Sequence, residues 1–273
     1  MHTRAGSLIL FRVNTLTDLC VCPHCHSSLD RTPALWTCTG CHRTYPIADG
    51  FPDFSPEIKH QGGLGQLGME IGFLVRFYES VWRPAFVRSM GRNWNRALTP
   101  ELEDAYLLEH VQPANGPVLD LACGAGRWTR TLVQRFGPEN VIGFDLSFAS
   151  LRACRAANPD SPLVRGNAWT LPFADQTFGA INCSNSLQLI PDTPRVLKEV
   201  GRTLKPGGTF TCFTFRRSPS STYRLLQGTV ERVMSVRAFR IEDIQQWLNA
   251  ANMELVDVSG PNLALLFTAR KLP

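Results

Sequence analysis

The chain has 273 residues and a formal net charge of +5, and 44% of its residues are hydrophobic. This length allows one large domain and a small one, and the hydrophobic share suits a soluble globular protein with an ample core. No run of 18 apolar residues occurs, so we expect no transmembrane helix, and the mild positive charge permits an anionic partner such as RNA without requiring one.

Residues 1–19 form an N-terminal segment whose short apolar patch is interrupted by Arg12 and is too weak for a signal peptide. Five of the nine cysteines then crowd into residues 20–41, whereas the other four are scattered along the rest of the chain. Scattered cysteines suit small buried side chains in a reducing compartment rather than a disulfide framework. We therefore predict a cytoplasmic protein.

Two cysteine pairs define a small first domain over residues 20–54. Their pattern is C-x2-C-x12-C-x2-C, formed by Cys22, Cys25, Cys38 and Cys41. Each pair stands on a turn, so four thiolates can converge on one tetrahedral ion, and a closed set of four sulfurs is typical of structural zinc. A segment this short has little core of its own, so metal binding should drive its folding. His42 could replace Cys41 in an alternative ligand set.

Residues 55–72 contain five glycines and are predicted to form a flexible linker. Residues 73–110 follow as a helical region, with a mixture of aromatic and basic residues over 73–90 and a further helix over 100–110. Ordinary packing against the core explains most of these aromatics. Tyr78 and Arg83 are the residues of this region that we single out for a possible role in a site.

From residue 111 onward, strands alternate with helices, which predicts an α/β fold with a mostly parallel, doubly wound sheet. The predicted strands lie near 118–122, 141–145, 162–165, 179–183, 208–215, 254–258 and 263–270, and the predicted helices near 127–136, 147–158, 193–204 and 242–251. Ser147 is a suitable N-cap for the second of these helices.

The turn after the first strand of this sheet predicts a cofactor site. Gly124 and Gly126 leave backbone N–H groups and a helix N-terminus open to a ligand. Thr129 replaces the third glycine of a dinucleotide fingerprint, and no P-loop lysine follows. Asp120 precedes the turn and suits a cationic ligand, while Asp145 closes the second strand and can accept two ribose hydroxyls. S-adenosylmethionine, with its sulfonium, ammonium and ribose, meets both requirements.

Five segments in this order resemble the motifs of class I S-adenosylmethionine-dependent methyltransferases of the type 11-like group. They are Leu119–Gly126, Gly143–Ser147, Gly166–Phe173, Ala180–Cys183 and Leu204–Gly208. The third is similar to an adenine-binding G-D-A-x-x-L-P-F motif, with Asn167 in place of the usual Asp. The resemblance implies a Rossmann-like, seven-stranded methyltransferase sheet over residues 111–273. It also implies that S-adenosylmethionine is bound by Asp120, Ala122, Cys123, Gly124, Gly126, Asp145, Leu146, Asn167, Ala168 and Cys183.

The cysteine segment, with its continuation Y-P-I-x-D-G-x-P-D-F, resembles zinc ribbons fused ahead of methyltransferases. Bacterial and plastid zinc-ribbon methyltransferases are the more similar group, because they share a helix like Phe77–Pro84. The rRNA guanine-N1 methyltransferases are more distant, since a histidine usually closes their zinc site. In such enzymes residues equivalent to 73–110 act as a lid, and the insert at 216–240 covers the substrate.

The resemblance implies in-line transfer of the sulfonium methyl to a nucleophile on an acceptor. The candidate catalytic residues are Gln188, Asn185 and Tyr78. Relatives often carry His where Gln188 stands, and because glutamine can orient an acceptor but cannot take its proton, histidine-style base catalysis is not expected. The insert 216–240 contains six arginines and one acid, which either hold a phosphate or carboxylate of the substrate or form a solvated helix face.

The predicted function is methylation of a small-molecule acceptor, a metabolite or natural product. The alternative is an RNA base methyltransferase that uses the zinc ribbon to bind phosphates, although the ribbon carries only Arg31 and Arg43 against three acids. Two further alternatives are use of S-adenosylmethionine for cyclisation and a non-catalytic module in which the ribbon docks a partner protein.

Overall fold

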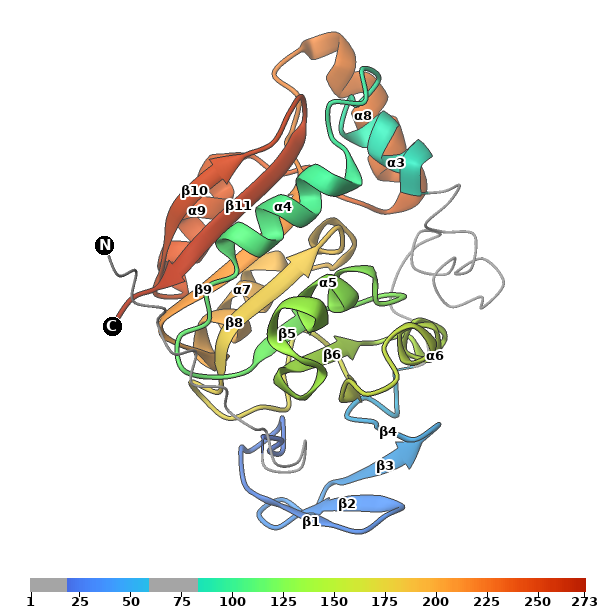
Figure 1. The fold of residues 1–273 in the computed structure, drawn as a ribbon, viewed down its shortest axis with the longest axis vertical. Helices are drawn as coiled ribbons and strands as arrows, with labels where there is room; N and C mark the ends of the chain where they lie inside the picture. Colours follow the sequence, from blue (N-terminus) through green and yellow to red (C-terminus); the bar gives the residue numbers. More distant parts are fainter. Residues whose placement is uncertain (1–18, 59–82) are drawn as a thin grey trace, which may run out of the picture.

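The computed structural model describes residues 19–58 and 83–273, which form a small antiparallel sheet beside a large mixed one (Figure 1). Residues 1–18 and 59–82 lie outside the described residues. They include most of the predicted N-terminal segment, the predicted linker from residue 59 onward, and the first part of the predicted helical region, with Tyr78. None of the helices described is long and apolar enough to cross a membrane.

The small sheet has the order β1-β2-β3-β4 and contains the predicted ribbon. Its strands are β1 (Leu29–Arg31), β2 (Leu35–Cys38), β3 (Thr44–Ala48) and β4 (Phe51–Pro52). Trp36 of β2 pairs with Tyr45 of β3, which places both rings near the ring of Phe54. The four predicted cysteine ligands come from three neighbouring segments of this sheet. Two lie in the turn before β1, one is the last residue of β2, and one lies in the turn before β3.

The large sheet has seven strands in the order β10-β11-β9-β8-β5-β6-β7. They are β5 (Val118–Leu121), β6 (Val141–Asp145), β7 (Leu163–Arg165), β8 (Phe178–Ser184), β9 (Leu204–Phe215), β10 (Met253–Ser259) and β11 (Ala264–Lys271). The five strands from β7 to β9 are parallel, and β11 and β10 form an antiparallel hairpin on β9. This arrangement confirms the predicted seven-stranded methyltransferase sheet.

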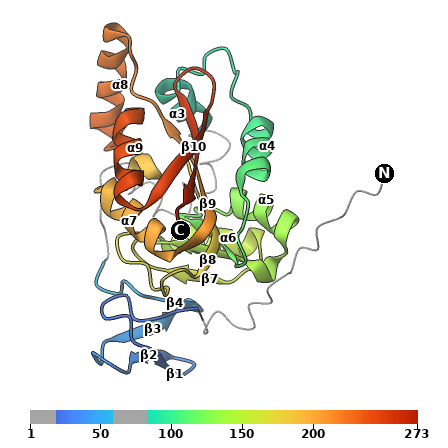
Figure 2. The ribbon, with the colours of Figure 1, turned by 90° about the vertical axis from the view of Figure 1, so that its left-hand side faces the viewer.

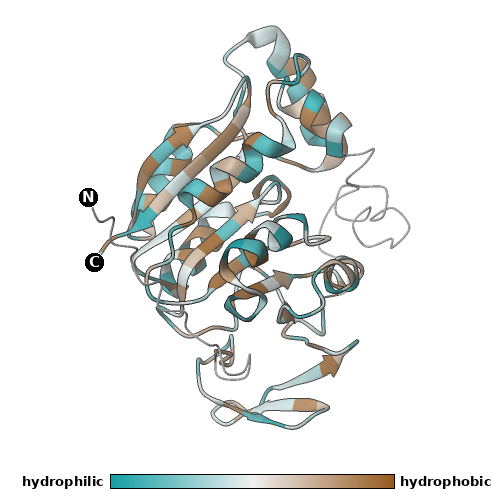
Figure 3. Ribbon diagram, viewed as in Figure 1, coloured by the Kyte–Doolittle hydropathy of each residue, from teal (hydrophilic) through white to brown (hydrophobic). Residues whose placement is uncertain are grey.

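Helices cover both faces of the large sheet (Figure 2). One face carries α4 (Pro100–His110), α5 (Arg127–Phe136) and α6 (Phe148–Ala157), and the other carries α7 (Thr193–Thr203) and α9 (Ile241–Ala250). The remaining helices are α3 (Arg83–Met90), α8 (Ser221–Met234) and the short η3 (Pro138–Asn140) and η4 (Leu187–Leu189). Brown, apolar segments run through the strands of the large sheet, whereas the helices mix brown with teal, as expected for a sheet buried between two helical layers (Figure 3).

Capping side chains explain where three of the described helices begin. Ser147 caps α6 by accepting a hydrogen bond from the N–H of Ser150, as predicted, and Thr99 and Asp192 cap α4 and α7 in the same way. Strand β9 begins four residues earlier than predicted, because Leu204 already pairs with Phe178 of β8 before the glycine turn.

The ribbon and the large domain share one apolar core. Trp36, Tyr45 and Phe54 belong to the same buried cluster as Phe144 and Phe173 of the large domain. The N–H of Val21 also donates to Pro172 O at 2.9 Å, which joins the chain ahead of the ribbon to the large domain. The ribbon therefore obtains from the large domain much of the core that its own length cannot supply.

Candidate cofactor and metal sites

The turn between β5 and α5 has the open backbone that its glycines predict. Ala122, Gly124 and Gly126 all have positive φ, at 56°, 55° and 83°. A Cβ on Gly126 would lie 2.5 Å from Asn158 Nδ2 and 2.7 Å from Cys154 Sγ, so no side chain fits there without displacing α6. The turn thus lies tightly against α6 and presents its backbone at the carboxyl edge of the sheet.

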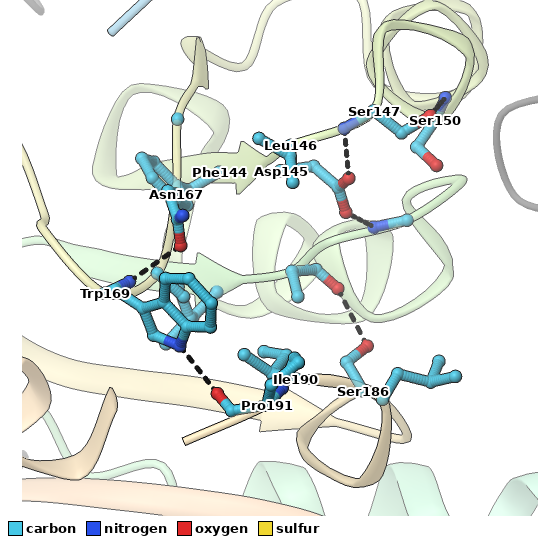
Figure 4. Close-up of a pocket in the computed structure, with 16 residues that line it drawn as sticks. Phe144, Asp145, Leu146, Ser147, Ser150, Asn167, Trp169, Ser186, Ile190 and Pro191 are labelled. Atoms are coloured by element: carbon cyan, nitrogen blue, oxygen red, sulfur yellow. Dashed lines mark hydrogen bonds between the residues drawn. The ribbon is translucent and has the colours of Figure 1, made fainter. Parts of the chain in front are cut away.

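Asp145 fastens this turn to the end of β6. One of its carboxylate oxygens accepts a hydrogen bond from the N–H of Gly124 at 2.9 Å, and the other accepts one from the N–H of Ser147 at 2.8 Å. Burial raises the pKa of the Asp145 carboxyl above its ordinary value, although these N–H donors and Arg165 act in the opposite direction. The carboxylate is therefore held in a fixed orientation at the mouth of the turn (Figure 4).

A cavity opens at this edge between the ends of β5, β6 and β7 and the segment that contains η4 (Figure 4). Six of the predicted cofactor residues line it: Ala122, Gly124, Asp145, Leu146, Asn167 and Ala168. The opposite wall consists of residues that were not predicted to bind the cofactor: Trp169, Ser186, Leu189, Ile190 and Pro191. Trp169 is fixed by a hydrogen bond from its indole Nε1 to Pro191 O at 2.6 Å. Because Trp169 lies inside the motif Gly166–Phe173, the sequence could have indicated it as a cofactor-binding residue.

The cavity is chemically suited to a nucleoside. Apolar side chains of Phe144, Leu146 and Ile190 provide surface for a flat base, and the Asp145 carboxylate provides an acceptor beside it. Ser150 Oγ, in the first turn of α6, is buried and lacks a hydrogen-bond partner among the described residues.

The four predicted cysteine ligands converge on one point. All four sulfur atoms lie within 4.8 Å of one another, with Cys22 Sγ to Cys41 Sγ at 3.6 Å and Cys25 Sγ to Cys38 Sγ at 3.3 Å. A tetrahedral thiolate site with metal–sulfur bonds of about 2.3 Å has sulfur–sulfur distances of about 3.8 Å, so the cluster is close to that geometry. The side chain of His42 is not part of the cluster, which favours the four-cysteine set over the alternative.

Comparison with known proteins identifies the large domain. Residues 118–208 match the family described as "Methyltransferase domain". The chain carries a class I S-adenosylmethionine-dependent methyltransferase domain. The match covers strands β5 to β8, the glycine turn and the cavity walls described above.

Individual relatives agree with this family. An uncharacterized chloroplastic methyltransferase from Arabidopsis thaliana is 25% identical over 282 residues, which cover 93% of this chain and 78% of that protein. The demethylmenaquinone methyltransferase of Lactococcus lactis is 40% identical over 101 residues, but these span only 35% of this chain and 40% of that enzyme. A structure of a Haloferax volcanii complex between the Trm112 methyltransferase activator and a methyltransferase matches with a TM-score of 0.55 at 17% identity, over 73% of this chain and 98% of that one.

Asp120 of the methyltransferase domain does not line the cavity, unlike the prediction that it faces the cofactor. Its two carboxylate oxygens accept hydrogen bonds from Thr129 Oγ1 and from Asn182 Nδ2, both at 2.6 Å, and its side chain is almost fully buried. Burial raises the pKa of Asp120 to about 6, although Thr129 and Asn182 act to lower it. Asp120 thus fastens α5 to β8 beneath the glycine turn.

Three other predicted cofactor residues lie behind the cavity wall. Cys123, Gly126 and Cys183 are absent from the lining of this cavity. Cys183 is fully buried and pairs in register with Cys212 of β9, so its thiol is part of the sheet core. Cys123 faces Gly143, where its sulfur would lie 3.2 Å from an added Cβ.

The candidate catalytic residues of the methyltransferase domain form a buried polar network beside the cavity. Gln188 Nε2 donates to Asn185 Oδ1 at 3.0 Å, and Gln188 Oε1 accepts from Thr214 Oγ1 at 3.0 Å. Both Asn185 and Gln188 are nearly inaccessible and neither lines the cavity. Tyr78 lies outside the described residues, and Arg83 is buried in an ion pair with Glu103.

The arginines of the 216–240 insert separate into two sets. Arg216, Arg217, Arg224 and Arg240 line a cleft at the start of α9, whereas Arg232 and Arg237 do not. Glu242 is the acid in this lining, and its carboxylate lies 3.5 Å from Arg240 Nε. Four cations around one cleft create a positive potential that suits an anionic group.

Proposed function

We propose that this chain binds S-adenosylmethionine in the cavity beside Asp145 and methylates a small-molecule acceptor. The observation that supports it best is the joint placement of a fixed carboxylate, an open glycine turn and apolar walls at the carboxyl edge of a methyltransferase sheet. Asp145 would hold the ribose, and the segment Asn167–Trp169 with Leu146 would hold the adenine. When bound, the cofactor supplies a methyl group that is already activated.

The contribution of the chain is to bind, to orient and to exclude water. Trp169 and Pro191, joined by a hydrogen bond, close one side of the cavity, and the turn at Gly124 closes the other. The Asn185–Gln188–Thr214 network is buried behind the cavity wall and contains no base that could take a proton from an acceptor. This favours an acceptor that is nucleophilic without help from the protein, or one that loses its proton to solvent.

Support for a small-molecule acceptor comes from the Lactococcus lactis relative, whose name gives demethylmenaquinone as its substrate. An RNA substrate remains the second candidate, because the four-arginine cleft at the start of α9 is a suitable phosphate site. Purified protein incubated with labelled S-adenosylmethionine and either a small-molecule extract or bulk RNA distinguishes the two. We expect label in the small-molecule fraction, and label in RNA alone would refute that acceptor class.

We further propose that the four cysteines bind zinc. Their sulfur geometry supports this, as do the N–H groups of Gly40 and Cys41, which each lie 3.4 Å from Cys38 Sγ and would stabilise a thiolate. All nine cysteines are free, which supports a reducing, cytoplasmic compartment. Elemental analysis of the purified protein should find one zinc per chain, and the double variant with Cys22→Ser and Cys38→Ser should have none.

A further inference from the structure

One arginine connects the ribbon to the cofactor cavity. Arg165 is the last residue of β7, where it stands in register with Asp145 of β6 and directly precedes Gly166. Both Asp145 and Gly166 line the cavity, yet the Arg165 side chain points away from it into the contact with the ribbon. It is only 5% exposed.

The Arg165 guanidinium donates hydrogen bonds to both sides of this contact, from all three of its nitrogen atoms. On the ribbon side, Nη1 donates to both carboxylate oxygens of Asp53, at 2.7 and 2.9 Å, and to Ser55 O at 2.8 Å, while Nη2 donates to Ile58 O at 2.7 Å. On the cavity side, Nε donates to Leu146 O at 2.9 Å. The same guanidinium lies 4.4 Å from the ring centroid of Phe148, at the start of α6.

The cavity segment and Arg165 therefore cannot move independently. Leu146 lies between Asp145 and Ser147, so the bond from Arg165 Nε fixes the turn that orients the Asp145 carboxylate. The next residues after Arg165 are Gly166 and Asn167, which also line the cavity. A buried, charge-assisted bond of this kind holds its position because breaking it would leave an uncompensated buried charge.

A chain of contacts continues from Arg165 to the four-cysteine cluster. The N–H of Phe54, next to Asp53, donates to Arg165 O at 2.9 Å. The Phe54 ring packs against Tyr45, with ring centroids 4.8 Å apart. The Tyr45 hydroxyl in turn is hydrogen-bonded to Cys22 Sγ at 3.1 Å. The position of Asp53 thus depends on a ribbon whose fold depends on its metal.

We propose that the ribbon is a structural part of the cofactor site, and that Arg165 is the positioning residue through which metal binding and S-adenosylmethionine binding strengthen each other. This inference rests on the two binding sites proposed above. The metal-loaded ribbon places Asp53, Asp53 holds Arg165, and Arg165 fixes two segments of the cavity lining, the turn at Leu146 and the residues Gly166 and Asn167. Because such coupling is reciprocal, the cofactor should also slow the loss of the metal.

The first test uses two ribbon carboxylates that contact the large domain. Asp53 is buried against Arg165, whereas Asp49 is exposed and pairs with Arg152 of α6. We expect S-adenosylhomocysteine, titrated by calorimetry into zinc-loaded protein, to bind Asp53→Asn about 10-fold more weakly than wild type. Asp49→Asn, the matched control, should bind like wild type. Asp53→Glu, which keeps the charge, should recover part of the affinity. Equal affinity of wild type and Asp53→Asn, with zinc content equal in both, would overturn the proposal.

The second test needs no variant to fold. The rate at which wild-type protein transfers zinc to a chromogenic chelator is measured with and without saturating S-adenosylhomocysteine. We expect release to be several-fold slower with the ligand, and an unchanged rate in a protein that calorimetry shows to bind the ligand would refute the coupling alone. Failure of wild type to bind S-adenosylhomocysteine at all would instead refute the proposed function, and the coupling with it.

Discussion

Replacing Asp120 by Asn should make the protein less sensitive to rising pH. The Asp120 carboxyl is buried between Thr129 and Asn182, and burial raises its pKa to about 6, from an ordinary value of 3.8. An acid whose pKa is raised in the folded state favours folding while it is protonated, and this contribution is lost as the pH rises through about 6. A tenfold change in an acid dissociation constant corresponds to about 1.4 kcal/mol. Raising the pKa from 3.8 to about 6 therefore means that ionised Asp120 destabilises the native state by about 3 kcal/mol at pH 8.

Asparagine keeps the shape of the side chain, and Thr129 can reverse its hydrogen bond to accept from the new amide. Urea unfolding of the two proteins at pH 5, 6, 7 and 8, followed by circular dichroism, isolates the effect because both contain the same metal site and the same other carboxyls. The free energy of unfolding of Asp120→Asn relative to wild type should increase by about 1–2 kcal/mol between pH 5 and pH 8. A difference that stays constant over this range would refute the assignment of a raised pKa to Asp120.

Three further predictions follow from packing. Phe54→Ala removes the ring that joins the ribbon to the shared core, and we expect it to lower the free energy of unfolding by about 3–5 kcal/mol, measured by urea denaturation. Trp fluorescence and circular dichroism should report one transition in wild type, and two well-separated transitions would contradict a shared core. Gly126→Ala should cost about 3 kcal/mol in the same assay, because its φ is 83° and the new Cβ would collide with Cys154, and wild-type stability would contradict the turn geometry. Chelation of the metal should lower the melting temperature of the whole protein and not only that of the ribbon, whereas an unchanged main calorimetric transition would show two independent domains.

The sequence predicted most of the large domain because its signals are local. Apolar runs gave the parallel strands, and the capping side chains of Ser147 and Asp192 stand where α6 and α7 begin. The cysteine spacing predicted the four-sulfur cluster because each pair lies within a single turn. In each of these cases the residues that determine the structure are close together in the chain.

The features that could not be predicted from the sequence depend on contacts between residues far apart in the chain. The type and spacing of Asp120 suggested contact with a cation, but whether a strand-end carboxylate faces a cavity or a neighbouring helix depends on Asn182, 62 residues away. The same holds for Arg165, whose partner Asp53 precedes it by 112 residues. The ribbon also looked like a separate domain because its sequence pattern is self-contained, whereas its apolar residues complete a core that belongs to both parts.

The central claim is that the cavity beside Asp145 binds S-adenosylmethionine. Calorimetric titration of S-adenosylhomocysteine into wild type and Asp145→Asn tests it most directly, with the melting temperatures of both proteins as a check on folding. We predict one site per wild-type chain and at least about 10-fold weaker binding by the variant, because the variant loses the anionic acceptor and turns an amide toward the N–H of Gly124 or Ser147. Wild-type protein that gives no binding heat, or a folded variant that binds with unchanged affinity, would contradict the account.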